Sequence, residues 1–164
     1  MKKIIVLIAV LLSCLNLPSV SQPLDQEYTH HAVYLEVGGQ GILYTVNYDY
    51  RFTKFFAGRV GFTHFTIPAF FISDLTITGF PLMGEFLIGG VDHFFEIGLG
   101  VMPTIGETSF GFFSSTKSGL IGTANIGYRY QPADGGFLFR ASIPVFVTGK
   151  GARVWGGVSF GYAF

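Results

Sequence analysis

Cysteine and charge are scarce in this sequence. The 164-residue chain holds one cysteine, which excludes an internal disulfide and a zinc site built on several cysteines. Only 12% of the residues are charged, about half the usual share, and the formal net charge is zero. Because the chain carries no basic stripe, nucleic acid is not expected as a partner. From residue 32 onward no run of 18 apolar residues occurs, so no spanning helix is expected.

Glycine and aromatic residues are present in excess. The chain contains 23 glycines, and Phe, Tyr and Trp together make up 17% of it. Both suit strands and turns better than packed helices, so we expect an all-β chain rather than a helical bundle. A hydrophobic share of 49% excludes a disordered chain.

The N-terminal segment has the pattern of a secretory signal peptide. Two lysines precede an uninterrupted apolar run at 4–12, and the small residues Ser19 and Ser21 fit a cleavage site. The expected division is a signal peptide at 1–21, a periplasmic leader at 22–31 and a barrel domain at 32–164. Cys14 is then discarded with the signal. The alternative is that Cys14 belongs to a lipoprotein box and is acylated.

After the leader, apolar and polar residues alternate with period 2, which is typical of strands with two unlike faces. In the clearest segment, 42–52, one face is entirely apolar. Segments 120–130 and 153–164 repeat the pattern. We expect eight strands, at 32–38, 42–52, 55–65, 75–88, 93–103, 118–130, 136–146 and 153–164.

The expected connections alternate in length. Short turns at 53–54, 89–92 and 131–135 lie at one end. Longer loops at 66–74 and 104–117 lie at the other end, together with short loops at 39–41 and 147–152. This asymmetry is typical of outer-membrane barrels. Because backbone groups in lipid must all be paired internally, strands that span a membrane must close into a barrel. The predicted fold is an eight-stranded antiparallel up-and-down transmembrane β-barrel with both termini in the periplasm. A soluble periplasmic barrel, with the apolar face inward, is the alternative.

Strand parity assigns one balanced set of charged residues to the barrel interior. Its members are Glu36, Asp49, Arg51, Arg59, Glu85, Glu96, Arg129 and Arg140, and Arg153 shares their parity. An eight-stranded barrel is just wide enough for side chains to fill, and buried charges need partners. The set therefore predicts an ion-pair plug in the lumen. A narrow ion path is the alternative.

Aromatic residues on the opposite face gather near the short-turn end. They are Tyr48, Tyr50, Phe52, Tyr128, Tyr130, Tyr162 and Phe164. Such a belt is typical of the boundary between membrane and water, and it favours the membrane location over the soluble alternative.

The C-terminal strand resembles the signal read by the bacterial barrel-assembly machinery. Phe160, Tyr162 and Phe164 alternate up to the last residue, although Ser159 stands where such signals often carry glycine. The stretch YLEVGGQGILYTVNYDYRF at 34–52 resembles small outer-membrane proteins of Bacteroidota, and the architecture resembles the OmpA/OmpX-like barrels. The resemblance implies the bacterial outer membrane as location. It also implies outer-membrane lipid, the assembly machinery and periplasmic chaperones as partners. It implies no established activity. We expect a monomer.

One motif raises the question of catalysis. His64-Phe65-Thr66 is the nearest match to the His-x-Ser motif of the outer-membrane lipid A deacylases, barrels of similar size. Thr66 replaces the serine and no carboxylate is obviously placed, so His64 is expected to be an interfacial residue. The adjacent His30 and His31 point to opposite faces and cannot readily share a metal. No metal site and no cofactor are predicted.

Five phenylalanines occupy the two expected long loops, where loops facing water usually avoid them. They are Phe70, Phe71, Phe110, Phe112 and Phe113. Either the strands extend further and these rings contact lipid, or the rings form a hydrophobic mouth for an apolar ligand. The sequence thus predicts a barrel with a structural or surface-binding role and no catalysis. The alternatives are binding or transport of a small hydrophobic ligand, and lipid A modification around His64.

Overall fold

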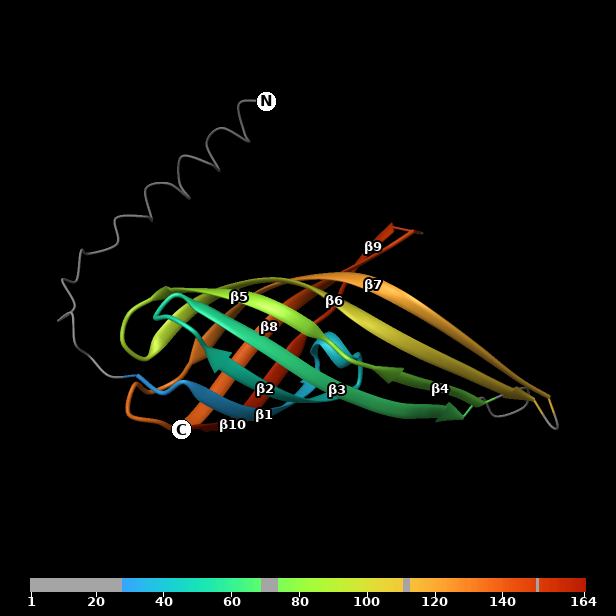
Figure 1. Ribbon diagram of the computed structural model, residues 1–164, viewed down its shortest axis with the longest axis horizontal. Helices are drawn as coiled ribbons and strands as arrows, with labels where there is room; N and C mark the ends of the chain where they lie inside the picture. The colour runs from blue at the N-terminus through green and yellow to red at the C-terminus, as the bar shows by residue number, and fades with distance from the viewer. Residues whose placement is uncertain (1–27, 69–73, 111–112, 150) are drawn as a thin grey trace, which may run out of the picture.

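Ten strand segments follow one another along the chain (Figure 1). The computed structural model describes residues 28–68, 74–110, 113–149 and 151–164. The segments are β1 (His31–Gly38), β2 (Tyr44–Arg51), β3 (Phe56–Pro68), β4 (Asp74–Gly79), β5 (Leu82–Gly89), β6 (His93–Phe110), β7 (Phe113–Tyr130), β8 (Gly136–Thr148), β9 (Gly151–Val154) and β10 (Gly157–Ala163). A short 3-10 helix, η1 (Gly39–Gly41), follows β1. Within these residues no helix is long and apolar enough to cross a membrane.

Two pairs of segments are each a single strand interrupted beside a proline. β4 and β5 keep one register against β3 on both sides of Pro81. β9 and β10 keep one register against β8, and the interruption at Trp155 lies opposite Pro144, whose carbonyl accepts the Trp155 N–H at 3.0 Å. Proline has no N–H to give to the ladder, so the regular pattern lapses without any change of register. The chain therefore builds eight continuous strands.

The sheet closes because β10 pairs antiparallel with β1. Ala32 lies opposite Ala163 at one end of this seam, and Gly38 lies opposite Gly157 at the other. All other neighbours follow chain order and are antiparallel. The predicted eight-stranded antiparallel barrel is confirmed, and a strand is present in each of the eight expected places.

Part of the sheet continues beyond the barrel. β7 pairs with β8 only up to Gly122, and β3 pairs with β2 only up to Phe62. β3, β4, β6 and β7 run on as a projecting sheet, seen at the right of Figure 1. The expected loop at 104–117 is therefore wrong, and the alternative that the strands extend is confirmed there. Polar and small residues occupy both faces of this part, so no period of 2 marks it in the sequence.

The two faces of the barrel are inverted relative to a soluble protein. Large apolar side chains on the outside are exposed, such as Leu99 at 69% and Phe86 at 58%, whereas inward residues such as Thr45 and Asn47 are buried. The apolar-inward arrangement of the soluble alternative is therefore wrong. An apolar exterior around a polar interior is the pattern of transmembrane barrels.

Gly161 in the closing strand offers a test of the seam. It lies opposite Tyr34, and a Cβ atom at this position would overlap the Tyr34 Cβ and the Val33 carbonyl oxygen. We expect Gly161→Ala to lower the free energy of unfolding by about 1–3 kcal/mol, since neither obstacle is the end of a flexible side chain. The measurement is urea unfolding of the protein refolded in lipid vesicles.

The matched control is Gly149→Ala, because open space surrounds Gly149. It should change the free energy of unfolding by no more than about 0.5 kcal/mol. Equal stability of the two variants would contradict the tight seam.

Candidate functional site

Four carboxylates and three guanidiniums meet inside the barrel, and we call them the lumen network. Each sits at an inward-facing position of a different strand, and all are at most 2% exposed. The members are Glu36 (β1), Asp49 (β2), Arg59 (β3), Glu85 (β5), Glu96 (β6), Arg129 (β7) and Arg140 (β8).

Arg129 and Arg140 each bind more than one carboxylate. Arg129 donates from Nε to Glu96 and from Nη2 to Glu85, both at 2.9 Å, and it also pairs with Asp49. Arg140 donates to Glu96 at 3.1 Å from Nε and to Glu85 at 3.0 Å from Nη2. Glu85 and Glu96 thus bridge the two guanidiniums, which joins the pairs into one network.

Tyr34 lies at the centre of this arrangement, although the sequence did not single it out. Its hydroxyl donates to Asp49 at 2.8 Å and accepts from Arg140 and, at 3.4 Å, from Arg59. The Arg140 guanidinium also lies 4.7 Å from the centre of the Tyr34 ring. Its spacing in the sequence could have identified it, because Tyr34 precedes Glu36 by two residues and therefore lies on the same face of β1.

Polar side chains and η1 complete the network towards the projecting-sheet end. Arg59 pairs with Glu85 at 3.1 Å and lies 3.9 Å from Glu36. Glu36 accepts from the Gln40 N–H of η1 at 3.0 Å and from the Ser142 hydroxyl at 3.2 Å. η1 is buried and was expected only as a short loop. The interior is therefore covered by backbone at this end.

Two arginines with inward parity do not join the network. Arg51 is buried, but it lies apart at the turn end and has no carboxylate within ion-pair distance among the described residues. Arg153 is exposed, so its expected inward position is wrong. The reason is that β9 pairs with the last residues of β8, where the closing strand has left the closed part of the barrel.

His64 lacks the surroundings of a catalytic base. It is exposed on β3, and its Nδ1 lies 2.9 Å from the Thr78 hydroxyl on β4. Thr66 is in turn bonded to Thr76 at 2.9 Å. A lipid A deacylase reaction at His64 is thus not supported, since no described carboxylate orients the ring. Within the described part of the chain, no cluster of His, Cys, Asp or Glu could hold a metal ion.

The structure places few of the residues expected to form a hydrophobic mouth. Phe70, Phe71 and Phe112 lie outside the described residues. The backbones of Phe110 and Phe113 are paired as the last register position of the β6–β7 hairpin. Binding of an apolar ligand there stays a prediction.

Aromatic rings contact one another along the turn end of the barrel, in two arcs that include the C-terminal strand. One arc runs through Phe164, His31, Tyr50, Phe52, Phe56 and Phe86, with ring centres 5.0–5.8 Å apart. The other arc runs through Tyr130, His93, Tyr128, Phe139, Phe160 and Phe137. Two histidines here form hydrogen bonds to neighbouring strands. His31 Nδ1 lies 2.7 Å from the Tyr48 hydroxyl, and His93 Nδ1 lies 2.6 Å from the Tyr128 hydroxyl. Rings that carry polar atoms fit a boundary between lipid and water.

Solved structures of outer-membrane barrels share this fold. Ail, the attachment invasion locus protein of Yersinia pestis, solved with the heparin analogue sucrose octasulfate, is 16% identical with a TM-score of 0.56. The match covers 83% of this chain and 97% of that one. The N-terminal β-barrel domain of Pseudomonas aeruginosa OprF is 13% identical with a TM-score of 0.59, covering 85% and 98%. No family model and no curated protein matches the sequence.

A double-mutant cycle on Arg140 and Glu96 tests whether the network stabilises the barrel. Arg140→Met leaves Glu85 and Glu96 with one cation fewer in a buried site, so we expect a loss of about 3–5 kcal/mol in the free energy of unfolding. Adding Glu96→Met removes one of the uncompensated carboxylates. The double variant should therefore lose less than the sum of the two single variants.

Urea unfolding in lipid vesicles measures all three variants, and Arg153→Met serves as the exposed control with a change within about 0.5 kcal/mol. Additive losses, or a loss from Arg140→Met as small as that of the control, would show that the pair does not act as a buried unit.

Proposed function

We propose that this protein is a small outer-membrane barrel whose lumen is closed by the lumen network, with a structural or surface-binding role and no catalysis. The observation that carries the proposal is the inversion of the two faces. Exposed apolar residues cover the outside and paired charges fill the inside. Only a surrounding apolar solvent makes that arrangement favourable.

The turn end supports a bilayer position for the closed barrel. Its aromatic arcs lie where the strands meet short turns, which is the interfacial position of aromatic belts in membrane proteins. The projecting sheet lies at the opposite end and is built of Thr, Ser and Gly as well as apolar residues. We infer that the turns face the periplasm and the projecting sheet faces the outside of the cell.

The lumen network favours a plug over an ion path. An ion moving through would have to break pairs that hold both guanidiniums of Arg129 and Arg140. Separating one partner from a buried pair costs about 3–5 kcal/mol. η1 also covers the interior beyond the network. The plug therefore acts as the solid core of the barrel, in the place that apolar side chains take in a soluble protein.

The projecting sheet is the surface that a partner outside the cell would meet. Residues 113–121 of β7 pair with β6 on one side only. An unpaired edge can add a strand from another chain. Ail was solved with a heparin analogue. In this chain the described charges of the projecting parts are balanced, which does not favour binding of a polyanion; they are Asp74, Glu107, Lys117 and Arg153.

One substitution on the outer face of the barrel tests both the membrane location of the protein and the outward orientation of its apolar face. Leu99 is the most exposed of the large hydrophobic residues that the structure describes, and it lies on β6. Leu99→Arg should therefore lower the free energy of unfolding in vesicles by about 2–4 kcal/mol. The native chain should sediment with outer membranes, resist carbonate extraction and change mobility on boiling in detergent.

Ser115→Arg is the matched control, since Ser115 is exposed on the projecting sheet beyond the closed barrel. It should change stability by no more than about 0.5 kcal/mol. If Leu99→Arg is equally harmless and the protein is extracted as a soluble species, the membrane proposal fails.

Electrical recording in planar bilayers tests the plug. We expect the native chain to show no ion-conducting steps, because guanidiniums and carboxylates fill the cross-section. The double variant Arg140→Ala/Glu96→Ala removes two of these long side chains and should show transient steps. Regular conductance by the native chain would favour the ion path instead.

A further inference from the structure

Arg51 is a buried charged residue that does not belong to the lumen network. It ends β2 at the turn end and is 3% exposed. Its Nη2 donates to the Lys54 carbonyl oxygen at 3.1 Å, but Nε and Nη1 have no hydrogen-bond partner within the described part of the chain. Buried guanidinium N–H groups without acceptors are costly, so this position calls for an acceptor from outside the described residues.

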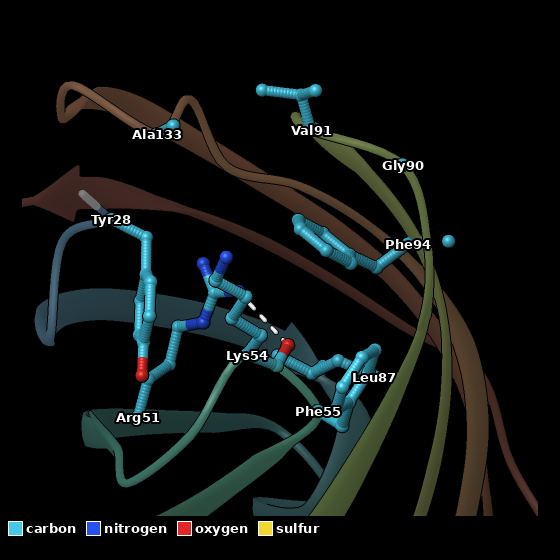
Figure 2. Close-up of a pocket in the computed structure, with 10 residues that line it drawn as sticks. Tyr28, Arg51, Lys54, Phe55, Leu87, Gly90, Val91, Phe94 and Ala133 are labelled. Carbon is cyan, nitrogen blue, oxygen red and sulfur yellow. Dashed lines mark hydrogen bonds between the residues drawn. The ribbon is translucent and has the colours of Figure 1, made fainter. Parts of the chain in front are cut away.

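Two aromatic rings fix the direction of the guanidinium. Its central carbon lies 4.7 Å from the centre of the Tyr28 ring and 4.9 Å from that of Phe94 (Figure 2). Tyr28 is held in place through its neighbours. The Arg51 N–H donates to the His30 carbonyl oxygen at 2.7 Å, and the His30 ring Nδ1 lies 2.8 Å from the Arg51 carbonyl oxygen. The Thr29 N–H donates to the Ala133 carbonyl oxygen at 3.0 Å. The cation is thus oriented before any ligand arrives.

A half-open cavity of about 30 Å³ lies beside this guanidinium. Tyr28, Arg51, Lys54, Leu87 and Phe94 line it, between the β2–β3 and β5–β6 turns (Figure 2). The volume suits one oxygen atom of a ligand whose remainder stays outside. The nearby Asp92 carboxylate does not fill it, since that group accepts the Ala133 N–H at 3.1 Å.

We propose that this pocket binds a phosphate group, with an oxygen accepting from one of the two unpartnered Arg51 N–H groups, Nε or Nη1, and with Lys54 supplying a second positive charge. Arginine and lysine together favour a phosphate over a neutral acceptor. The pocket lies at the level of the aromatic arcs, where the phosphates of phospholipids are found in a bilayer. Its rim carries Phe55 at 64% and Val91 at 41% exposure, which suit the apolar part of a lipid.

The proposal is tested on the full chain refolded in a non-ionic detergent. One arm titrates inorganic phosphate, and the other titrates a short-chain phosphatidylglycerol. The readout is the nitrogen-15 NMR signal of the Arg51 Nε–H group together with lipid retention in native mass spectrometry. We expect both ligands to shift the signal, the lipid at lower concentration. The lipid arm rests on the proposed membrane location, whereas the inorganic phosphate arm does not.

Variants assign the binding to this pocket. Arg51→Gln should weaken binding about tenfold or more, and Lys54→Gln should weaken it about threefold. Lys117→Gln, which removes a cation from the projecting sheet, should leave binding unchanged. If Arg51→Gln fails to fold, Lys54→Gln and the direct signal of Arg51 in the native chain still decide the question.

Three results would overturn the proposal. The Arg51 signal could stay unshifted by either ligand, which would leave a water-filled cavity. Binding could persist at full strength in Lys54→Gln and Arg51→Gln. Finally, Asp25→Asn/Glu27→Gln, which neutralises the carboxylates just before Tyr28, could destabilise the barrel as much as Arg51→Gln. The acceptor would then be the chain's own leader.

Discussion

Closure of the sheet between β1 and β10 is the constraint on which the interior depends. The lumen network draws its members from strands far apart in the sequence: Arg129 and Asp49 are 80 residues apart, and Arg140 and Glu85 are 55 apart. Seven strands supply one charged member each, so opening the seam would separate carboxylates from guanidiniums on both sides. The backbone ladder and the ion pairs therefore stabilise each other. The apolar exterior follows, because a sheet whose inner face is charged can place its apolar side chains only outside.

The number of strands and the faces were predictable because each depends on local alternation. A period of 2 places Glu36 and Asp49 inside whatever their partners are. The pairing within the network was not predictable, since Arg129 reaches three carboxylates whose positions depend on the tilt and register of the closed barrel. Tyr34 was missed for a related reason. An inward tyrosine looks like an apolar residue in the sequence, and its hydroxyl matters only once Asp49 and Arg140 are beside it.

The strands of the projecting sheet could not be predicted from alternation of apolar and polar residues. At 104–108 and 115–117 both faces are half-exposed or exposed, so selection for an apolar face is absent and the strands carry no alternation. The length of this segment also favours a loop, because it is short enough to be a connection between two strands. The prediction for Arg153 is wrong for a related reason. Alternation places this residue on the inward face, but β9 lies beyond the closed part of the barrel. Alternation of apolar and polar residues depends on the environment of a strand. It identifies a strand only where one face contacts an apolar environment and the other a polar one.

The two ends of the barrel differ in how they satisfy buried polar groups. Towards the projecting sheet, η1 donates its own backbone N–H to Glu36 and covers the network. At the turn end, residues 28–30 are hydrogen-bonded to Ala133 and Arg51, and Arg51 Nε and Nη1 have no hydrogen-bond partner among the described residues. Buried donors in a finished fold nearly always have acceptors. What distinguishes Arg51 from Arg59, which also has a buried Nε–H without a partner, is that Arg51 has no carboxylate within ion-pair distance among the described residues. Four carboxylates against three guanidiniums in the network also mean that Arg51 completes the charge balance from a distance. Its position at the rim, rather than among the carboxylates, is what leaves it able to bind something that arrives from outside.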